Sequence, residues 1–183
     1  MPSMFRPPKR RRKAPPLIFL VLLVLGLLLI GYLDQQRREI HAANGSRVVV
    51  RDGDSLAIDA TEFRIFGIDA PELRQTCMDA SGKPWRCGEA ARSALQKLVS
   101  QGGLRCSPQA RDRFGRVVAT CRVDGAGDIG AAMVRAGFAA RFGQRETGDY
   151  LAAENDARRD KRGIWQGAFA TPADWRREHP RLD

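Results

Sequence analysis

The most apolar stretch of the chain runs from Leu17 to Leu33 and contains no charged residue and no proline. As a helix rising about 1.5 Å per residue, it would reach about 26 Å, near the short limit for the core of a bilayer. A helix buried in a protein core normally keeps a polar face, and this segment has none. The pattern therefore predicts a transmembrane helix at residues 17–33.

The charges that flank this segment predict its orientation. A basic cluster, Lys9 to Lys13, precedes it, and Asp34 and Glu39 follow it. By the positive-inside rule, residues 1–16 form a basic cytoplasmic tail and the chain after Leu33 lies on the periplasmic or extracellular side. A cleaved signal peptide is the alternative, but charged and bulky residues follow the apolar segment where a small-residue cleavage site would be needed.

After a polar linker at residues 34–45, the pattern changes to short β-branched runs separated by turn residues. These runs predict strands at residues 47–51, 55–58, 61–68, 104–109 and 117–123. Apolar residues at helical spacing, followed by glycine, predict helices at residues 88–100, 128–136 (with Asp128 as N-cap) and 148–162. The order predicts an α+β domain at residues 46–168, a five-stranded OB-fold β-barrel with three helices, and a polar C-terminal tail at residues 169–183.

Composition adds a mild electrostatic bias to this domain. The chain has 31 Lys and Arg against 21 Asp and Glu, a formal net charge of +10. Residues 1–33 contribute +6 of it, which leaves +4 for the exported part. Such an excess allows a polyanionic partner but does not require one.

All four cysteines follow the apolar segment, which agrees with export to an oxidising compartment. Two cysteines separated by two residues do not occur, and both histidines lie at the ends of the exported part, so a zinc site is disfavoured. Four cysteines allow three pairings. We expect Cys77–Cys87, which would close a loop, and Cys106–Cys121, which would join two neighbouring strands; four free thiols are the alternative.

Charged residues gather at or near the ends of the predicted strands. They are Asp52, Asp54, Asp69, Glu72 and Arg116, and Arg64 lies inside the third predicted strand. Carboxylates brought together at loop ends are the ligands that Ca²⁺ prefers. Arginines suit the charge that develops on phosphoryl oxygens, and a nearby glutamate can orient or deprotonate water. Together the set predicts metal-assisted phosphodiester hydrolysis.

The third predicted strand contains a geometric conflict. Strict alternation would point Arg64 and Asp69 to opposite faces of the strand, although the proposed chemistry needs both on one side. Glycine inside a strand often marks a bulge or a bend. We therefore expect Gly67 to break the alternation.

Five motifs in order resemble the staphylococcal nuclease, or thermonuclease-like, family over about residues 46–168. They are D-G-D-S (52–55), R-I-F-G-I-D-A-P-E (64–72), C-G-E-A-A (87–91), D-R-F-G-R (112–116) and G-I-W-Q-G (163–167). The resemblance implies an OB-fold enzyme that uses Ca²⁺ and cuts DNA and RNA to 3′-phosphate products.

The resemblance also implies a role for each matching residue. Asp54 and Asp69, with the backbone carbonyl of Ala70, would bind Ca²⁺, and Glu72 would position or activate water. The remaining residues would bind phosphate or support the metal site: Arg64 and Arg116 at the transition state, Arg113 and Phe114 at the terminal phosphate of the nucleotide, and Asp52 beside the metal. A tyrosine is common in the family where Phe114 stands, so a hydroxyl contact to phosphate is missing here.

Two functions are compatible with this sequence. One is an active, membrane-anchored Ca²⁺-dependent nuclease, expected to be a monomer with nucleic acid as its substrate. The other is a catalytically silent OB-fold module that binds nucleic acid or a protein partner at the membrane. A silent module would be expected to have lost a metal carboxylate or a phosphate-binding arginine, and here all of them are present.

Overall fold

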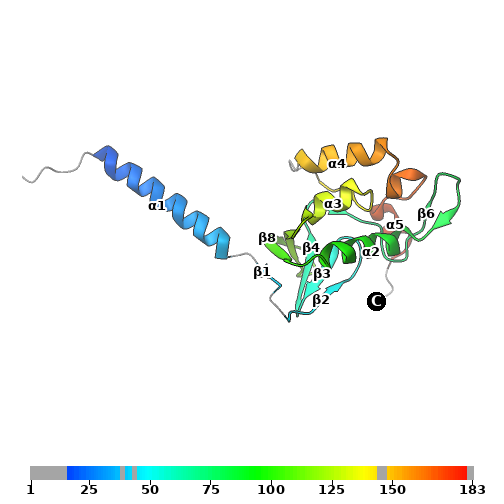
Figure 1. The fold of residues 1–183 in the computed structure, drawn as a ribbon, viewed down its shortest axis with the longest axis horizontal. Coiled ribbons are helices and arrows are strands. Elements are labelled where there is room, and N and C mark those ends of the chain that lie inside the picture. Colours follow the sequence, from blue (N-terminus) through cyan, green and yellow to red (C-terminus); the bar gives the residue numbers. More distant parts are fainter. Residues whose placement is uncertain (1–15, 38–39, 43–44, 144–147, 181–183) are drawn as a thin grey trace, which may run out of the picture. The chain divides into compact units, whose positions relative to one another are not determined.

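A computed structural model describes residues 16–37, 40–42, 45–143 and 148–180. The chain divides into two compact units, Met1–Arg38 and Glu39–Asp183. The first unit contains the helix α1 (Pro16–Arg37), and the second contains all the other elements (Figure 1). Each unit is considered by itself.

Helix α1 covers the predicted membrane segment and continues to Arg37, inside the predicted linker. The large apolar side chains described in it, between residues 18 and 32, are exposed, up to 71% at Phe19. Among the residues that the structure describes, no helix combines the length and the apolar character needed to cross a membrane. The anchor at residues 17–33 stays a prediction, and the predicted basic tail lies outside the described residues except for Pro16.

A curled sheet forms the centre of the second unit (Figure 1). Its strand pairs are antiparallel except for β4 and β9, which are parallel. Its strands follow the order β1-β8-β9-β4-β3-β2, and β10 adds to β9. Their bounds are β1 (Ile40–His41), β2 (Val48–Val50), β3 (Ser55–Ile58), β4 (Thr61–Ile65), β8 (Arg105–Arg111), β9 (Val117–Val123) and β10 (Gly127–Asp128). Two further ladders pair β5 (Ile68–Asp69) with β11 (Ala140–Arg141), and β6 (Cys77–Met78) with β7 (Pro84–Trp85). The α+β prediction is confirmed, and the strands lie close to their predicted bounds.

Two details of the predicted barrel are corrected. The main sheet has seven strands rather than five, and the described pairings form an open half-barrel rather than a closed one. The two additional strands are β10, which pairs with β9, and β1, which lies in the predicted linker and pairs with the outer edge of β8, with Ile40 opposite Cys106. The linker prediction is therefore wrong at residues 40–41, because a β-strand of only two residues carries too short a pattern to recognise.

The three predicted helices of the domain are confirmed as α2 (Cys87–Val99), α3 (Ile129–Arg135) and α4 (Gly148–Arg159). Asp128 caps α3 as expected, since its side chain accepts a hydrogen bond from the Ala131 N–H at 3.0 Å. Helix α3 packs against both α2 and α4. The core beneath them is formed by apolar side chains of the sheet and of these helices, with Leu56, Phe63 and Leu95 fully buried.

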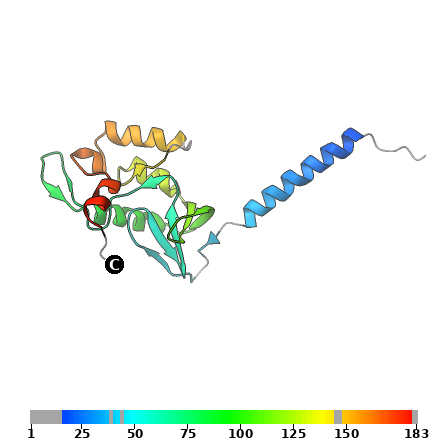
Figure 2. The same ribbon diagram turned by 180° about the vertical axis from the view of Figure 1, so that it is seen from behind.

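The predicted C-terminal tail is wrong over much of its length. A 3₁₀ helix, η1 (Gly163–Gln166), follows α4, and a further helix, α5 (Pro172–Glu178), follows η1. Thr171 caps α5, because its hydroxyl accepts a hydrogen bond from the Asp174 N–H, and Pro172 stands in the first turn. Helix α5, red in both ribbon views, lies near the N-terminal end of α2 (Figure 2).

Both predicted disulfides are confirmed. Cys106 and Cys121 are directly opposite each other on β8 and β9, and their bond joins these strands. Cys77 and Cys87 link β6 to the first residue of α2, with a Cα–Cα distance of 5.7 Å, and pack against Ile164. The Cys77–Cys87 bond therefore ties the segment after β5 to α2.

Candidate active site

Arg64 joins the two carboxylates that the sequence predicted as metal ligands. Its Nη1 lies 2.9 Å from Asp54 Oδ1, and its Nη2 lies 2.8 Å from Asp69 Oδ1. This requires Arg64 and Asp69 to share a side, and the chain achieves it by ending β4 at Ile65 and turning at Gly67, whose φ is 76°. The predicted break at Gly67 is confirmed, since a positive φ is the region that favours glycine.

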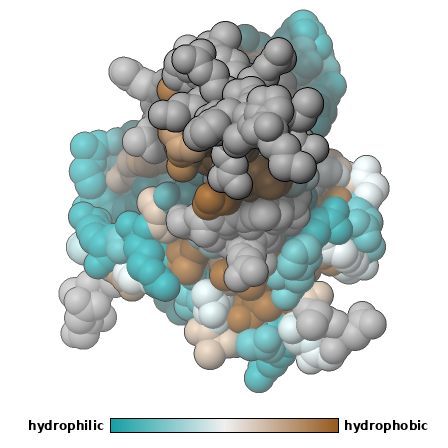
Figure 3. Space-filling model, turned by 90° about the vertical axis from the view of Figure 1, so that its left-hand side faces the viewer, coloured by the Kyte–Doolittle hydropathy of each residue, from teal (hydrophilic) through white to brown (hydrophobic). Residues whose placement is uncertain are grey.

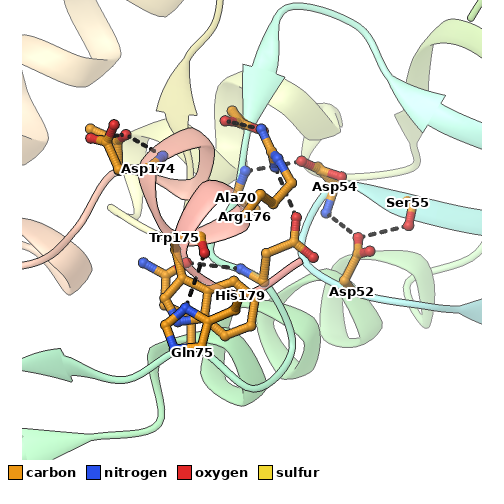
Figure 4. Close-up of polar contacts among 12 residues, drawn as sticks. Asp52, Asp54, Ser55, Ala70, Gln75, Asp174, Trp175, Arg176 and His179 are labelled. Atoms are coloured by element: carbon orange, nitrogen blue, oxygen red, sulfur yellow. Dashed lines mark hydrogen bonds and ion pairs between the residues drawn. The ribbon is translucent and has the colours of Figure 1, made fainter. Parts of the chain in front are cut away.

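Asp54 is the most deeply buried of these carboxylates, with only 4% of its surface exposed. Its Oδ2 accepts a hydrogen bond from the Ala70 N–H at 3.0 Å (Figure 4). Burial raises the pKa of Asp54 to about 8, although Arg64 favours the charged form. The nearby Asp52 and Asp69 add to the increase. Loss of water around the carboxyl group is therefore the main cause of the raised pKa, and neighbouring negative charge is a lesser one.

Asp52 supports the turn that presents Asp54. Its Oδ1 accepts hydrogen bonds from the Asp54 N–H at 3.1 Å and from the Ser55 hydroxyl at 2.7 Å (Figure 4). Between these two aspartates, a Cβ added at Gly53 would lie 2.7 Å from the Cβ atoms of Ala70 and Ala91. The turn thus fits closely against the end of β5 and against α2, which fixes the position of Asp54.

Glu72 lies on a loop that is held from two sides. The buried side chain of Gln75 accepts a hydrogen bond from the Glu72 N–H at 3.1 Å and donates one to the Ala170 carbonyl at 2.7 Å. On the other side lies Gly88 of α2, where an added Cβ would stand 1.8 Å from the Glu72 carbonyl oxygen. Gln75 and Gly88 therefore position the glutamate, although neither was predicted as a site residue.

Arg176 is the site residue that the sequence analysis missed. It comes from α5, and its Nη1 lies 2.8 Å from Glu72 Oε1 and 3.2 Å from Asp69 Oδ1, while its Nη2 lies 3.1 Å from Asp69 Oδ2 (Figure 4). Partial burial alone would lower the pKa of Arg176, but hydrogen bonds to both carboxylates outweigh it and raise the pKa. Thr171-Pro172, a typical helix start, was the signal that could have revealed α5.

The other predicted arginine, Arg116, lies outside this group of contacts. Its Nε donates to Asp112 Oδ2 at 2.7 Å, within the turn between β8 and β9. Partial burial would raise the pKa of Asp112, but the hydrogen bonds from Arg116 and the Phe114 N–H lower it. The register still sets this turn beside the site, because β9 runs parallel to β4 and Val118 pairs with Arg64.

The predicted nucleotide contacts, Arg113 and Phe114, occupy the tip of the same turn. The Phe114 side chain is 69% exposed. The guanidinium carbons of Arg113 and Arg116 lie 4.8 and 5.5 Å from its ring centroid. This tip combines an accessible aromatic face with two cations, which are the groups that bind bases and phosphates.

The donor atoms at Asp54, Asp69 and Ala70 fit a hard cation. Two carboxylates and a backbone carbonyl are the oxygen donors that Ca²⁺ takes, and Arg64 holds the two carboxylates together. Within the described residues, no group of three or more His, Cys, Asp or Glu side chains gathers around one point. A bound cation would therefore use two side-chain carboxylates here and complete its shell with carbonyl oxygen and water.

Residues 62–167 match the family described as staphylococcal nuclease homologues. The chain belongs to this family. The match includes Arg64, Asp69, Glu72 and Arg116 and confirms the predicted resemblance. Helix α5 follows the residues matched to this staphylococcal nuclease homologue family and brings Arg176 to the site.

Similar curated proteins come from bacteria and fungi. The chain is 36% identical over 119 residues to the succinoglycan biosynthesis protein ExoI of Rhizobium meliloti, covering 64% of this chain and 62% of that protein. It is 30% identical over 134 residues to an uncharacterized endonuclease of Escherichia coli, covering 70% and 81%. It is 34% identical over 120 residues to the probable endonuclease LCL3 of Paracoccidioides brasiliensis, covering 57% and 34%.

Proposed function

We propose that the domain is a Ca²⁺-dependent nuclease that hydrolyses DNA and RNA to 3′-phosphate products. The observation that carries the proposal is Arg64 bridging Asp54 and Asp69, with Glu72 held beside them. Family membership and the endonuclease names of two relatives support the same activity. The names of these relatives specify neither the metal ion nor the chemical ends of the products, so both belong to the proposal.

The side chains divide the proposed reaction among them. Glu72 accepts a proton from the attacking water or holds that water in line. Arg64 and Arg116 donate hydrogen bonds to the phosphoryl oxygens, where negative charge grows in the transition state. Arg113 and Phe114 hold the neighbouring nucleotide. Bound Ca²⁺ supplies Lewis-acid stabilisation of the same charge.

The test is an assay of the purified full-length chain in detergent, with both disulfides intact. Labelled DNA and RNA are incubated in millimolar Ca²⁺ or in excess EGTA, and the product ends are identified by mass spectrometry. We expect cleavage with Ca²⁺ only, and 3′-phosphate ends. Intact DNA and RNA in Ca²⁺ would overturn the proposal and favour the silent binding module.

We also propose that α1 anchors the domain to a membrane, with the domain on the exported side. A series of exposed large apolar side chains on one helix supports this, because such surfaces are rarely left in water. Figure 3 shows brown, hydrophobic residues among teal, hydrophilic ones on one face of the molecule. Full-length protein that resists carbonate extraction from membranes is the expected result. A soluble product that begins near Ala43 would contradict it.

A further inference from the structure

Arg176 forms an unusual combination of contacts for a side chain at the edge of the site. Its two terminal nitrogens lie within 3.2 Å of both carboxylate oxygens of Asp69, and one of them also reaches Glu72. These residues are the predicted metal ligand and the predicted water-activating residue. Asp69 Oδ1 also accepts from Arg64, so the fork from Arg176 occupies the side of Asp69 that faces Glu72, and a metal ion that bridges these two carboxylates would have to displace it.

The helix that carries Arg176 is fixed, but the side chain itself is accessible. Pro172 is buried, and Gln75 holds the Ala170 carbonyl just before the helix. The rings of Trp175 and His179 stack at 4.4 Å on the same helix (Figure 4). The Arg176 side chain is 39% exposed, so it can leave the carboxylates by changing rotamer while α5 stays in place.

Arg64 and Arg176 differ in what they do for the carboxylates. Arg64 belongs to β4 and joins Asp54 to Asp69, which keeps the two carboxylates together. Arg176 approaches from outside the sheet and takes the remaining oxygen of Asp69 together with Glu72. It thus supplies the positive charge that a metal ion would supply on this side of the site.

We propose that Arg176 is a displaceable internal cation that competes with the metal ion for Asp69 and Glu72. Helix α5 then sets the Ca²⁺ concentration at which the site becomes loaded. In the metal-free protein the guanidinium pairs with both carboxylates, and on loading it moves away from them. The inference rests on the proposed function for the identity of the metal, and it concerns binding rather than cleavage.

The experiment is a calorimetric titration of the full-length chain in detergent with CaCl₂, without nucleic acid. We compare the wild type with Arg176→Gln and with Arg177→Gln. Arg177 is the matched control, because it has the same charge on the same helix and its ion-pair partner is Asp174 rather than Asp69 or Glu72. We expect Arg176→Gln to lower the Kd for Ca²⁺ about tenfold and Arg177→Gln to change it less than about twofold.

A second measurement guards against a folding artefact. Thermal unfolding in EGTA and in Ca²⁺ should show that Arg176→Gln is less stable than wild type without metal and gains more from Ca²⁺. An Arg176→Gln affinity equal to or weaker than that of Arg177→Gln overturns the inference, and so does an absence of Ca²⁺ binding in every variant. If the tenfold shift occurs but nucleic acid stays intact, only the proposed nuclease function fails.

Discussion

Two regions contribute to the proposed reaction and are built in opposite ways. One is the cluster of Asp54, Asp69, Glu72, Arg64 and Arg176, and the other is the turn between β8 and β9. In this cluster, Arg64 is hydrogen-bonded to residues 5 and 10 positions away, Asp69 and Asp54, and Arg176 joins it from more than 100 positions away, at 107 from Asp69 and 104 from Glu72. In the turn, Arg116 is held by Asp112, four residues away. The first arrangement depends on the whole domain, and the second depends on one hairpin.

Burial differs in the same way. Asp54 and Asp69 are almost completely buried, whereas Phe114 is exposed at the tip of the turn. A buried, interlocked group is costly to disturb, because a charge left without its partner remains out of water. An exposed hairpin can change with little loss of stability. Substitutions in the two regions should therefore separate loss of activity from loss of fold.

The largest expected effect comes from Arg64→Ala. It removes the cation shared by two buried carboxylates, so we expect activity to fall by at least about a thousandfold and the free energy of unfolding to fall by about 3 kcal/mol. Ca²⁺-dependent DNA hydrolysis and urea unfolding measure the two losses. Arg64→Lys, which keeps the charge without the fork, serves as the control and should keep more stability than activity. Unchanged stability in Arg64→Ala would contradict the interlocked arrangement.

Arg116→Ala tests the other half of the comparison. Its pair with Asp112 lies in a hairpin, so we expect stability to change by less than about 1 kcal/mol. Activity should still fall by about a hundredfold or more, since a donor to the transition state is lost. The same two assays measure it. A stability loss as large as that of Arg64→Ala would mean that the turn belongs to the interlocked region.

Gly88→Ala probes how closely the Glu72 loop fits. The added methyl would overlap the Glu72 carbonyl, so the loop or α2 must move. We expect the free energy of unfolding to fall by about 2 kcal/mol, with a loss of activity because Glu72 shifts. Ser93→Ala, at an exposed position of the same helix, should stay within about 0.5 kcal/mol. Full activity in Gly88→Ala would show that the glutamate's position is not critical.

The last expected effect is a pH dependence of stability from Asp54. Its pKa is about 8 in the folded protein and about 3.9 in an unfolded chain, so between these values the folded state holds a proton that the unfolded state has released. In EGTA, the free energy of unfolding should therefore decrease through Asp54 as the pH rises from about 4 to about 8. Urea unfolding of wild type and Asp54→Asn measures it, and identical pH profiles would contradict the assignment.

The sequence predicted the parts of this site that depend on local pattern. Turn residues marked Asp54 and Asp69 at strand ends, and the need to reconcile Arg64 with Asp69 pointed to a break at Gly67. The α+β class and the helix ends followed from periodicity and glycine. These features depend on neighbouring residues, which is why a single sequence contains them.

The missed parts depend on contacts between distant segments. Gln75 reads as one polar residue in an irregular loop, and only the fold reveals that it joins Glu72 to Ala170. Arg176 looks like a solvated charge until α5 packs beside the carboxylates. The edge strand β1 was missed for the same reason, because Ile40 pairs with Cys106, which is far away in the sequence. Local periodicity contains no information about such partners.

The bond between Cys77 and Cys87 has a consequence for damage to the chain. Between these residues lies an exposed hairpin turn, residues 80–83, of the kind that proteases attack. A single cut there would open the backbone between Glu72 and α2, yet the disulfide would keep both fragments in one covalent molecule. The nicked protein would thus lose a chain connection without losing the attachment of its glutamate loop to the helix that supports it.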